Sequence, residues 1–179
     1  MKHFALLAAA ATLLVAHPAS AALPVGAAAP DFSTQGAMGG KPFQFSLRQA
    51  LKKGPVVLYF FPAAFTPGCT IESKAFADAS DDFTKAGAQI VGVAADPIEK
   101  LQKFSVEACR SKFPVAVASP KMIADYNVTL PMLAGRSNRT SFVIGKDARI
   151  AYVHSEMKPG GHITGTLGAV RTLAAKSRK

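Results

Sequence analysis

The side chains best suited to chemistry lie in one segment, Pro62-Ala63-Ala64-Phe65-Thr66-Pro67-Gly68-Cys69. Thr66 is a favourable helix N-cap, and Pro67 suits the first helical position because its missing N–H needs no partner there. Cys69 is therefore predicted to lie in the first helical turn, where free backbone N–H groups and the helix dipole favour a thiolate. Cysteines in such positions have pKa values of about 3.5 to 7.5 instead of about 8.5. The segment predicts a nucleophilic thiolate, with the Thr66 hydroxyl close enough to hydrogen-bond the sulfur or an oxygen bound to it.

An apolar strand is predicted to position this thiol. The run Gly54-Pro55-Val56-Val57-Leu58-Tyr59-Phe60-Phe61 is rich in β-branched and aromatic residues, which favours a strand buried on both faces, as in a parallel sheet. Pro62 ends the strand, so the Cys69 helix starts at its carboxyl end. The alternative for Cys69 is an inert buried cysteine, since free cysteine is among the most buried residue types.

The other segments predict an α/β fold. Residues 23–40 are small, polar and turn-rich, and they predict no regular element before a short edge strand at 43–45. The rest of the chain is predicted to form helices at 46–53, 67–85, 97–108, 120–126 and 163–175, and strands at 54–61, 88–94, 114–118, 140–144 and 150–153. This order favours a central mixed β-sheet flanked by helices.

Residues 1–21 are predicted to be a secretory signal peptide. Met1-Lys2-His3 supplies a positive start, residues 4–15 an apolar core, and Ala19-Ser20-Ala21 a small-residue cleavage site. The alternative is an uncleaved membrane anchor. A helix needs about 20 apolar residues to span a bilayer, and this apolar core is shorter. We therefore expect an exported protein, in the periplasm of a bacterium, in which residues 22–179 form one domain without stable membrane insertion.

Composition disfavours nucleic acid as a partner. The formal net charge is +10, but the basic residues are scattered, and neither an aromatic-interleaved basic patch nor a nucleic-acid motif accompanies them. The two cysteines, Cys69 and Cys109, cannot build a disulfide framework, although an oxidising compartment permits a bond between them. His154 and His162 are eight residues apart without a cysteine near them in sequence, so we assign them no metal and no chemical role.

Several blocks of the sequence together resemble one known family. Pro62, Thr66 and Cys69 reproduce the Pro-x-x-x-Thr-x-x-Cys signature of peroxiredoxins, and residues 66–72 resemble the peroxiredoxin Q, or bacterioferritin comigratory protein, subfamily. Residues 29–32, 57–61 and 139–144 resemble further family blocks in the same order. The resemblance implies a thioredoxin-like fold and a monomeric thiol peroxidase that reduces hydrogen peroxide and organic hydroperoxides. It implies no metal and no other cofactor.

The resemblance also implies roles for five residues. Cys69 is the peroxidatic cysteine that becomes a sulfenic acid, Thr66 hydrogen-bonds near it, and Pro62 shields the thiolate from water. Arg139 is expected beside the sulfur, since a guanidinium stays charged and can bind a thiolate and peroxide oxygens together. Cys109 is the candidate resolving cysteine, which would form an intramolecular disulfide that a thiol reductant such as a thioredoxin-like protein reopens. The alternative for Cys109 is a cysteine of the core.

Three further residues bear on these roles. Arg136 lies three residues before Arg139 and is its main rival. Glu72 is expected to support the helix start and its loop instead of taking part in chemistry. Lys74 stands five residues after Cys69, where many peroxiredoxin Q proteins carry a resolving cysteine, so that arrangement is absent.

Three alternative functions fit the sequence less well. An exported thiol-disulfide oxidoreductase of the same fold normally carries Cys-x-x-Cys, but Glu72 stands where the second cysteine of that motif would be. A nonenzymatic binding protein of thioredoxin-like fold, such as a copper carrier, would need a cysteine where Ser73 stands. The presence of Thr66, Cys69 and Arg139 together argues against a binding module that has lost its chemistry.

Overall fold

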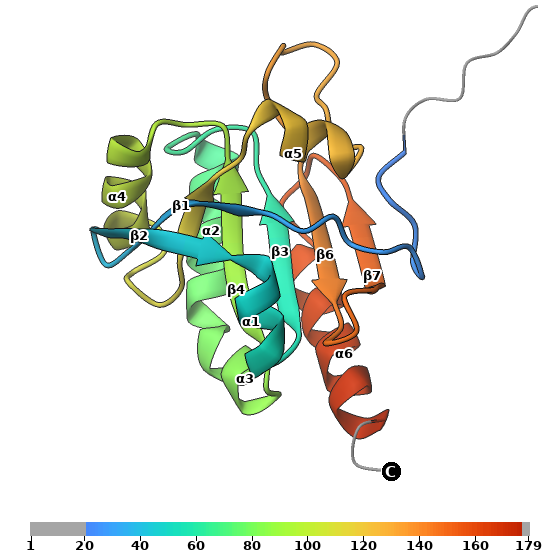
Figure 1. Ribbon diagram of the computed structural model, residues 1–179. Coiled ribbons are helices and arrows are strands. Elements are labelled where there is room, and N and C mark those ends of the chain that lie inside the picture. Colours follow the sequence, from blue (N-terminus) through green and yellow to red (C-terminus); the bar gives the residue numbers. More distant parts are fainter. Residues whose placement is uncertain (1–20, 177–179) are drawn as a thin grey trace, which may run out of the picture.

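The computed structural model describes residues 21–176, so the predicted signal peptide lies, except for its last residue, outside the described residues. Seven strands form one mixed sheet in the order β2-β1-β5-β4-β3-β6-β7, with helices on both faces (Figure 1). This arrangement confirms the predicted α/β class. Within these residues, no helix is long and apolar enough to cross a membrane. The elements are β1 (Ser33–Met38), β2 (Lys41–Ser46), α1 (Leu47–Lys53), β3 (Val56–Phe60), α2 (Pro67–Asp78), α3 (Ser80–Lys85), β4 (Gln89–Ala94), α4 (Ile98–Glu107), β5 (Val115–Val117), α5 (Pro120–Asp125), β6 (Thr140–Ile144), β7 (Ile150–Ser155) and α6 (His162–Lys176).

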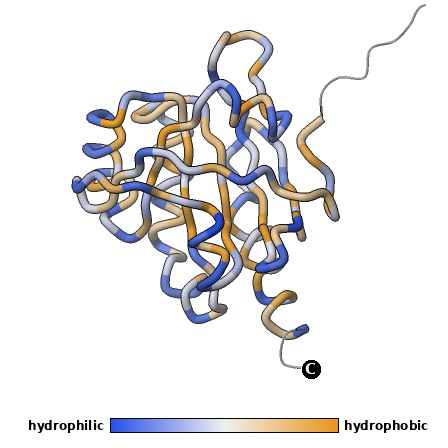
Figure 2. Tube along the Cα trace, viewed as in Figure 1, coloured by the Kyte–Doolittle hydropathy of each residue, from blue (hydrophilic) through white to orange (hydrophobic). Residues whose placement is uncertain are grey.

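The central strand β3 leads directly to the candidate thiol. All of its residues are buried, and it pairs parallel with β4 and antiparallel with β6. Val56, Leu58 and Phe60 pack in one core layer, which includes residues of α1 and α5. Val57 and Tyr59 pack in the other layer, with residues of α2, α4 and α6. Both faces of the strand are therefore covered, as its continuous apolar sequence predicts, and Figure 2 shows the hydrophobic residues gathered along the central strands.

Strand β1 corrects the expectation that residues 23–40 contain no regular element. Its sequence is mostly small and polar, which disfavours a strand on local preference alone. It pairs antiparallel with β2 on one side and with β5 on the other. Gly39 and Gly40, both at positive φ, form the tight turn into β2. The neighbouring strands therefore decide the conformation of β1.

The helix predicted over residues 67–85 is in fact two helices. It is interrupted at Ala79, which lies between α2 and α3. Asp81 and Asp82 stand in the first turn of α3, where negative charge stabilises a helix start. The break lets the ring of Phe83 pack on Phe76, with 5.9 Å between ring centroids. A helical repeat of apolar residues continues through the break, which is why the sequence pattern does not reveal it.

Replacing Gly54 by alanine is expected to lower the free energy of unfolding by about 1–3 kcal/mol, the usual range for overpacking. A Cβ atom at Gly54 would lie 2.2 Å from the carbonyl oxygen of Gly87, so two backbone segments would have to separate. The control is Gly168→Ala in α6, where the added Cβ meets nothing within 4 Å apart from its own helix backbone and chain neighbours. That change should instead raise stability by about 0.5–1 kcal/mol through helix propensity. Urea unfolding of both variants checks the difference, and equal effects would contradict this packing argument.

Candidate active site

Cys69 lies where the sequence places it, in the first turn of α2. Pro67 is the first residue of that helix, and Thr66 precedes it in an extended N-cap conformation. The Cys69 side chain is only 1% exposed and belongs to the core layer that covers one face of β3. Burial alone would also fit an unreactive cysteine of the core. The reactivity of the thiol therefore depends on the polar groups around its sulfur.

The Thr66 hydroxyl does not lie as predicted. It makes no capping hydrogen bond and instead donates to the carbonyl oxygen of Ala63 at 3.0 Å. The cause is the tight turn before the helix, in which Phe65 adopts a φ of 68° and brings the Ala63 carbonyl within reach. Of the two predicted partners of this hydroxyl, the sulfur and an oxygen bound to it, the sulfur makes no hydrogen bond with Thr66 in the part of the chain that the structure describes.

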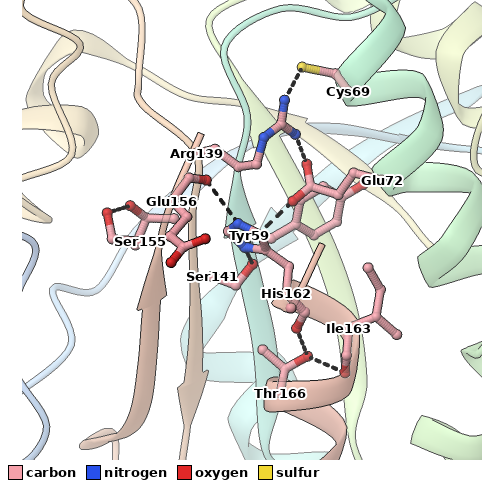
Figure 3. Close-up of polar contacts among 12 residues, drawn as sticks. Tyr59, Cys69, Glu72, Arg139, Ser141, Ser155, Glu156, His162, Ile163 and Thr166 are labelled. Carbon is pink, nitrogen blue, oxygen red and sulfur yellow. Dashed lines mark hydrogen bonds and ion pairs between the residues drawn. The ribbon is translucent and has the colours of Figure 1, made fainter. Parts of the chain in front are cut away.

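Arg139 points its guanidinium at the sulfur (Figure 3). Its Nη2 donates to the Sγ of Cys69 at 3.5 Å, and its Nε donates to the carbonyl oxygen of Met157 at 2.9 Å. Its Nη1 pairs with the carboxylate of Glu72. Gly68 permits this approach, since a Cβ there would lie 3.1 Å from Nη2. The buried guanidinium is thus held by three partners, namely the Glu72 carboxylate, the Met157 carbonyl and the Cys69 sulfur.

The rival arginine, Arg136, has a different position. Its Nη1 lies 3.0 Å from the carboxylate of Asp96 and donates to the Pro62 carbonyl oxygen at 3.4 Å. The other Asp96 oxygen accepts from the backbone N–H of Ala64 at 2.8 Å, and Lys100 pairs with the same carboxylate. Burial opposes the charge of Asp96, but these hydrogen bonds outweigh it and lower its pKa. Arg136 and Asp96 therefore hold the loop that starts at Pro62, while Arg139 contacts the sulfur.

Glu72 has a closer relation to the sulfur than the support of the helix start and loop that the sequence predicts. It is fully buried against Arg139, one turn after Cys69. Burial raises its pKa to about 7, although attraction to Arg139 acts in the opposite direction. The spacing of three residues from Cys69 could have indicated a shared helix face, since residues three apart are neighbours on a helix.

His162, to which the sequence assigned no role, lies behind Glu72 at the start of α6. Its Nδ1 is 2.8 Å from the Ser141 hydroxyl and 3.6 Å from the Oε1 of Glu72. Its Nε2 is 3.0 Å from the carbonyl oxygen of Glu156. Burial lowers the pKa of His162 to about 4, so the imidazole is neutral at physiological pH. A chain of buried polar groups therefore runs from the Cys69 sulfur through Arg139 and Glu72 to this ring.

Cys109 is fully buried and follows α4 in the same core layer as Cys69. Both cysteines are free thiols in this structure. Burial raises the pKa of the Cys109 thiol to about 12, although the hydroxyl groups of Tyr59 and Ser73 act in the opposite direction. Ser73 lies four residues after Cys69, which places it one turn along the same face of α2. The structure thus brings Cys109 to the helix of Cys69 but not into a bond with it.

The matching family model and named relatives identify the family. The AhpC/TSA family model matches residues 25–153. The chain is a peroxiredoxin of the AhpC/TSA family. It is 33% identical over 138 residues to the chloroplastic peroxiredoxin Q of Sedum lineare, which covers 75% of this chain and 71% of that protein. The crystal structure of the Mycobacterium tuberculosis peroxidoxin BcpB is 34% identical, with a TM-score of 0.72 over 83% of this chain and 97% of that one.

The fold of the peroxiredoxin extends to more distant relatives. The reduced 2-Cys peroxiredoxin of Plasmodium vivax is 21% identical and superposes with a TM-score of 0.76 over 86% of this chain and 83% of that one. This likeness and the BcpB match confirm the predicted thioredoxin-like architecture. Family membership also confirms the predicted enzyme class, a thiol-dependent peroxidase that uses a peroxide substrate and a thiol reductant. Among residues 21–176, no group of three or more histidine, cysteine or acidic side chains could hold a metal ion.

Proposed function

We propose that this peroxiredoxin reduces hydrogen peroxide and organic hydroperoxides through Cys69. The observation that supports this proposal is the 3.5 Å hydrogen bond from Arg139 to the Cys69 sulfur, made by a guanidinium that Glu72 and the Met157 carbonyl hold in place. The thiolate attacks one peroxide oxygen, so that an S–O bond forms and the O–O bond breaks. Cys69 is oxidised to sulfenic acid, and the leaving oxygen takes up a proton to give water or an alcohol. Arg139 stabilises both the thiolate and the negative charge on the leaving oxygen.

Two residues of the preceding loop complete the proposed site. Pro62 lies directly after the buried strand end, and we assign it the exclusion of water from the thiolate. Thr66 carries an exposed side chain three residues before Cys69, and its hydroxyl bonds only within the loop, to Ala63. Rotation of the Thr66 side chain would release this hydroxyl to donate to a bound peroxide oxygen. The sequence predicted a Thr66 hydroxyl near the sulfur or an oxygen bound to it, and this assignment keeps the second of these partners.

Cys109 is our candidate for the resolving thiol. Its sulfur would attack the sulfenic sulfur of Cys69, so that an S–S bond forms, the S–O bond breaks and water leaves with the thiol proton. It is the only other cysteine in the chain, and it lies in the same buried core layer as Cys69. Both thiols are buried, so α2 or the end of α4 has to open locally before the bond can close. A thiol reductant such as a thioredoxin-like protein would then reopen the disulfide.

The intact mass of the protein after one equivalent of peroxide tests this assignment. Reduced wild type is expected to lose two hydrogen atoms, because a disulfide between Cys69 and Cys109 forms without adding oxygen. Cys109→Ser is expected to gain one oxygen atom, since its sulfenic acid has no partner. A stable oxygen adduct on the wild type would contradict resolution by Cys109 and leave that residue in the core.

We further propose that the protein is exported and acts as a monomer. The charged start, the apolar residues 4–15 and the small residues before Ala22 support cleavage after Ala21. To test export, the protein is expressed in a bacterium and its intact mass is measured in the periplasmic fraction. The mass should correspond to residues 22–179, and an uncleaved chain would contradict the proposal. Light scattering on that sample measures the oligomeric state, which should be a single chain.

A further inference from the structure

One oxygen of the Glu72 carboxyl group lacks the partner that a buried polar atom normally has. Its Oε2 pairs with Arg139, but its Oε1 is buried without a hydrogen bond. Buried polar atoms are satisfied in the large majority of cases, so an exception asks for a physical explanation. The Nδ1 of His162 lies 3.6 Å from this Oε1, a little beyond hydrogen-bond distance (Figure 3).

The hydrogen bonds of His162 determine which of its nitrogens carries a proton. Its Nε2 faces the carbonyl oxygen of Glu156 at 3.0 Å, and a carbonyl can only accept, so the hydrogen is on Nε2. Burial lowers the pKa of the ring to about 4, which leaves the imidazole neutral. The Nδ1 atom therefore presents a lone pair, and the Ser141 hydroxyl donates to it at 2.8 Å.

An ionised Glu72 would then place two acceptors, Oε1 and Nδ1, against each other in a buried site. A proton between them removes this conflict, either as a carboxylic acid that donates to Nδ1 or as an imidazolium that donates to Oε1. The pKa of Glu72, raised to about 7 by burial, supports the uptake of that proton near neutral pH. The other titratable or charged groups around the pair are Cys69, Tyr59, Arg139, His154 and Cys109.

None of these surrounding groups supplies the missing donor. Arg139 already donates to the other Glu72 oxygen, and Tyr59 shares a 3.0 Å hydrogen bond with Ser73. His154 and His162 form an edge-to-face ring pair with 4.4 Å between centroids, and the buried Nε2 of His154 has no hydrogen-bond partner within the described residues. A proton between Glu72 and His162 would satisfy Oε1 from side chains already in contact with it.

We propose that Glu72 and His162 bind one proton between them, and that His162 is thereby a positioning residue for peroxide reduction. With the proton the pair is neutral, and the charge of Arg139 acts fully on the Cys69 sulfur. Without it the Glu72 carboxylate offsets that charge, which weakens stabilisation of the thiolate and of the leaving oxygen. Peroxide reduction should therefore lose this support as pH rises through neutrality. The inference deepens the proposed function and rests on it for its catalytic consequence.

Carbon NMR of the full chain, labelled with ¹³C at the glutamate δ position, observes the proton directly. The sequence holds four glutamates, Glu72, Glu99, Glu107 and Glu156, so four resonances are expected, and loss of one in Glu72→Gln assigns that residue. In reduced wild type, Glu72 should titrate near pH 7, well above the ordinary glutamate value of about 4.3. Titration of Glu72 at that ordinary value would overturn the proposal.

Two variants test the role of His162. They should shift the midpoint of the Glu72 titration in opposite directions. His162→Asn places an amide donor near Oε1, which stabilises the carboxylate and should lower the midpoint by at least about one pH unit. Ser141→Ala removes the competing donor to Nδ1, so the carboxylic acid is better bound and the midpoint should rise. His154→Asn is the control and should leave the midpoint in place. Unchanged midpoints in both test variants would overturn the role of His162.

Rates of Cys69 oxidation link this proton to function. The ratio of the Glu72→Gln rate constant to that of wild type should rise about tenfold between pH 6 and pH 9, since the amide cannot ionise and weaken Arg139. A constant ratio would overturn the positioning role. A wild type that does not reduce peroxide, but whose Glu72 titrates near pH 7, would refute the proposed function while supporting the shared proton. The two failures are therefore distinguishable.

Discussion

Cys69→Ser is expected to lower the rate constant for peroxide reduction by at least about 10⁴-fold, the scale on which enzymes lose activity without their nucleophile. A thiolate attacks the O–O bond because it is both charged and polarisable, whereas a serine hydroxyl stays protonated near neutral pH. The geometry around Arg139 would remain, so the loss would reflect the missing sulfur. Stopped-flow measurement of peroxide consumption by the reduced protein gives the rate constant.

The control for this experiment is Cys109→Ser. In a single turnover it should oxidise Cys69 at close to the wild-type rate, because Cys109 enters only after the sulfenic acid has formed. Its steady-state turnover with a dithiol reductant should fall. Turnover retained by Cys69→Ser would refute Cys69 as the peroxidatic residue, and a slow first step in Cys109→Ser would show that the two thiols are coupled earlier.

Arg139→Lys is expected to reduce the rate constant of the first oxidation by about 10²- to 10³-fold, the usual effect of removing one donor to a developing oxyanion. Lysine keeps the positive charge beside Glu72, so the buried carboxyl group does not lose its cation. It cannot reproduce the planar fork that reaches Cys69, Glu72 and the Met157 carbonyl at once. The measurement is the same single-turnover reaction, made over a range of peroxide concentrations.

Arg136→Lys is the matched control, since it makes the same chemical change three residues away. Arg136 pairs with Asp96 and holds the Pro62 loop without contacting the sulfur. Its replacement should change the rate constant by no more than a few-fold. Equal losses in the two variants would contradict the assignment of Arg139 and would point to the loop as the sensitive element. Thermal unfolding of both variants separates loss of structure from loss of chemistry.

The parts of the fold that the sequence predicted correctly are those with strong local signals. The buried strand β3 and the helix start at Pro67 both depend on neighbouring residues, and both lie as predicted. Strand β1 and the break at Ala79 carry no such signal. They depend on pairing with β2 and β5 and on the packing of Phe83, which no local pattern contains.

For the site, the sequence by itself determined the nucleophile and its family, because helix-start preferences and the spacing of Pro62, Thr66 and Cys69 are local properties. Only the tertiary structure decided which arginine reaches the sulfur, where the Thr66 hydroxyl points and what surrounds Glu72. These contacts join residues as far apart in the sequence as Glu72 and His162, so they depend on strand order and on the position of α6. Burial then changes their acidity, so Glu72, whose sequence context indicated a helix-supporting residue, becomes a carboxyl group that titrates near neutrality.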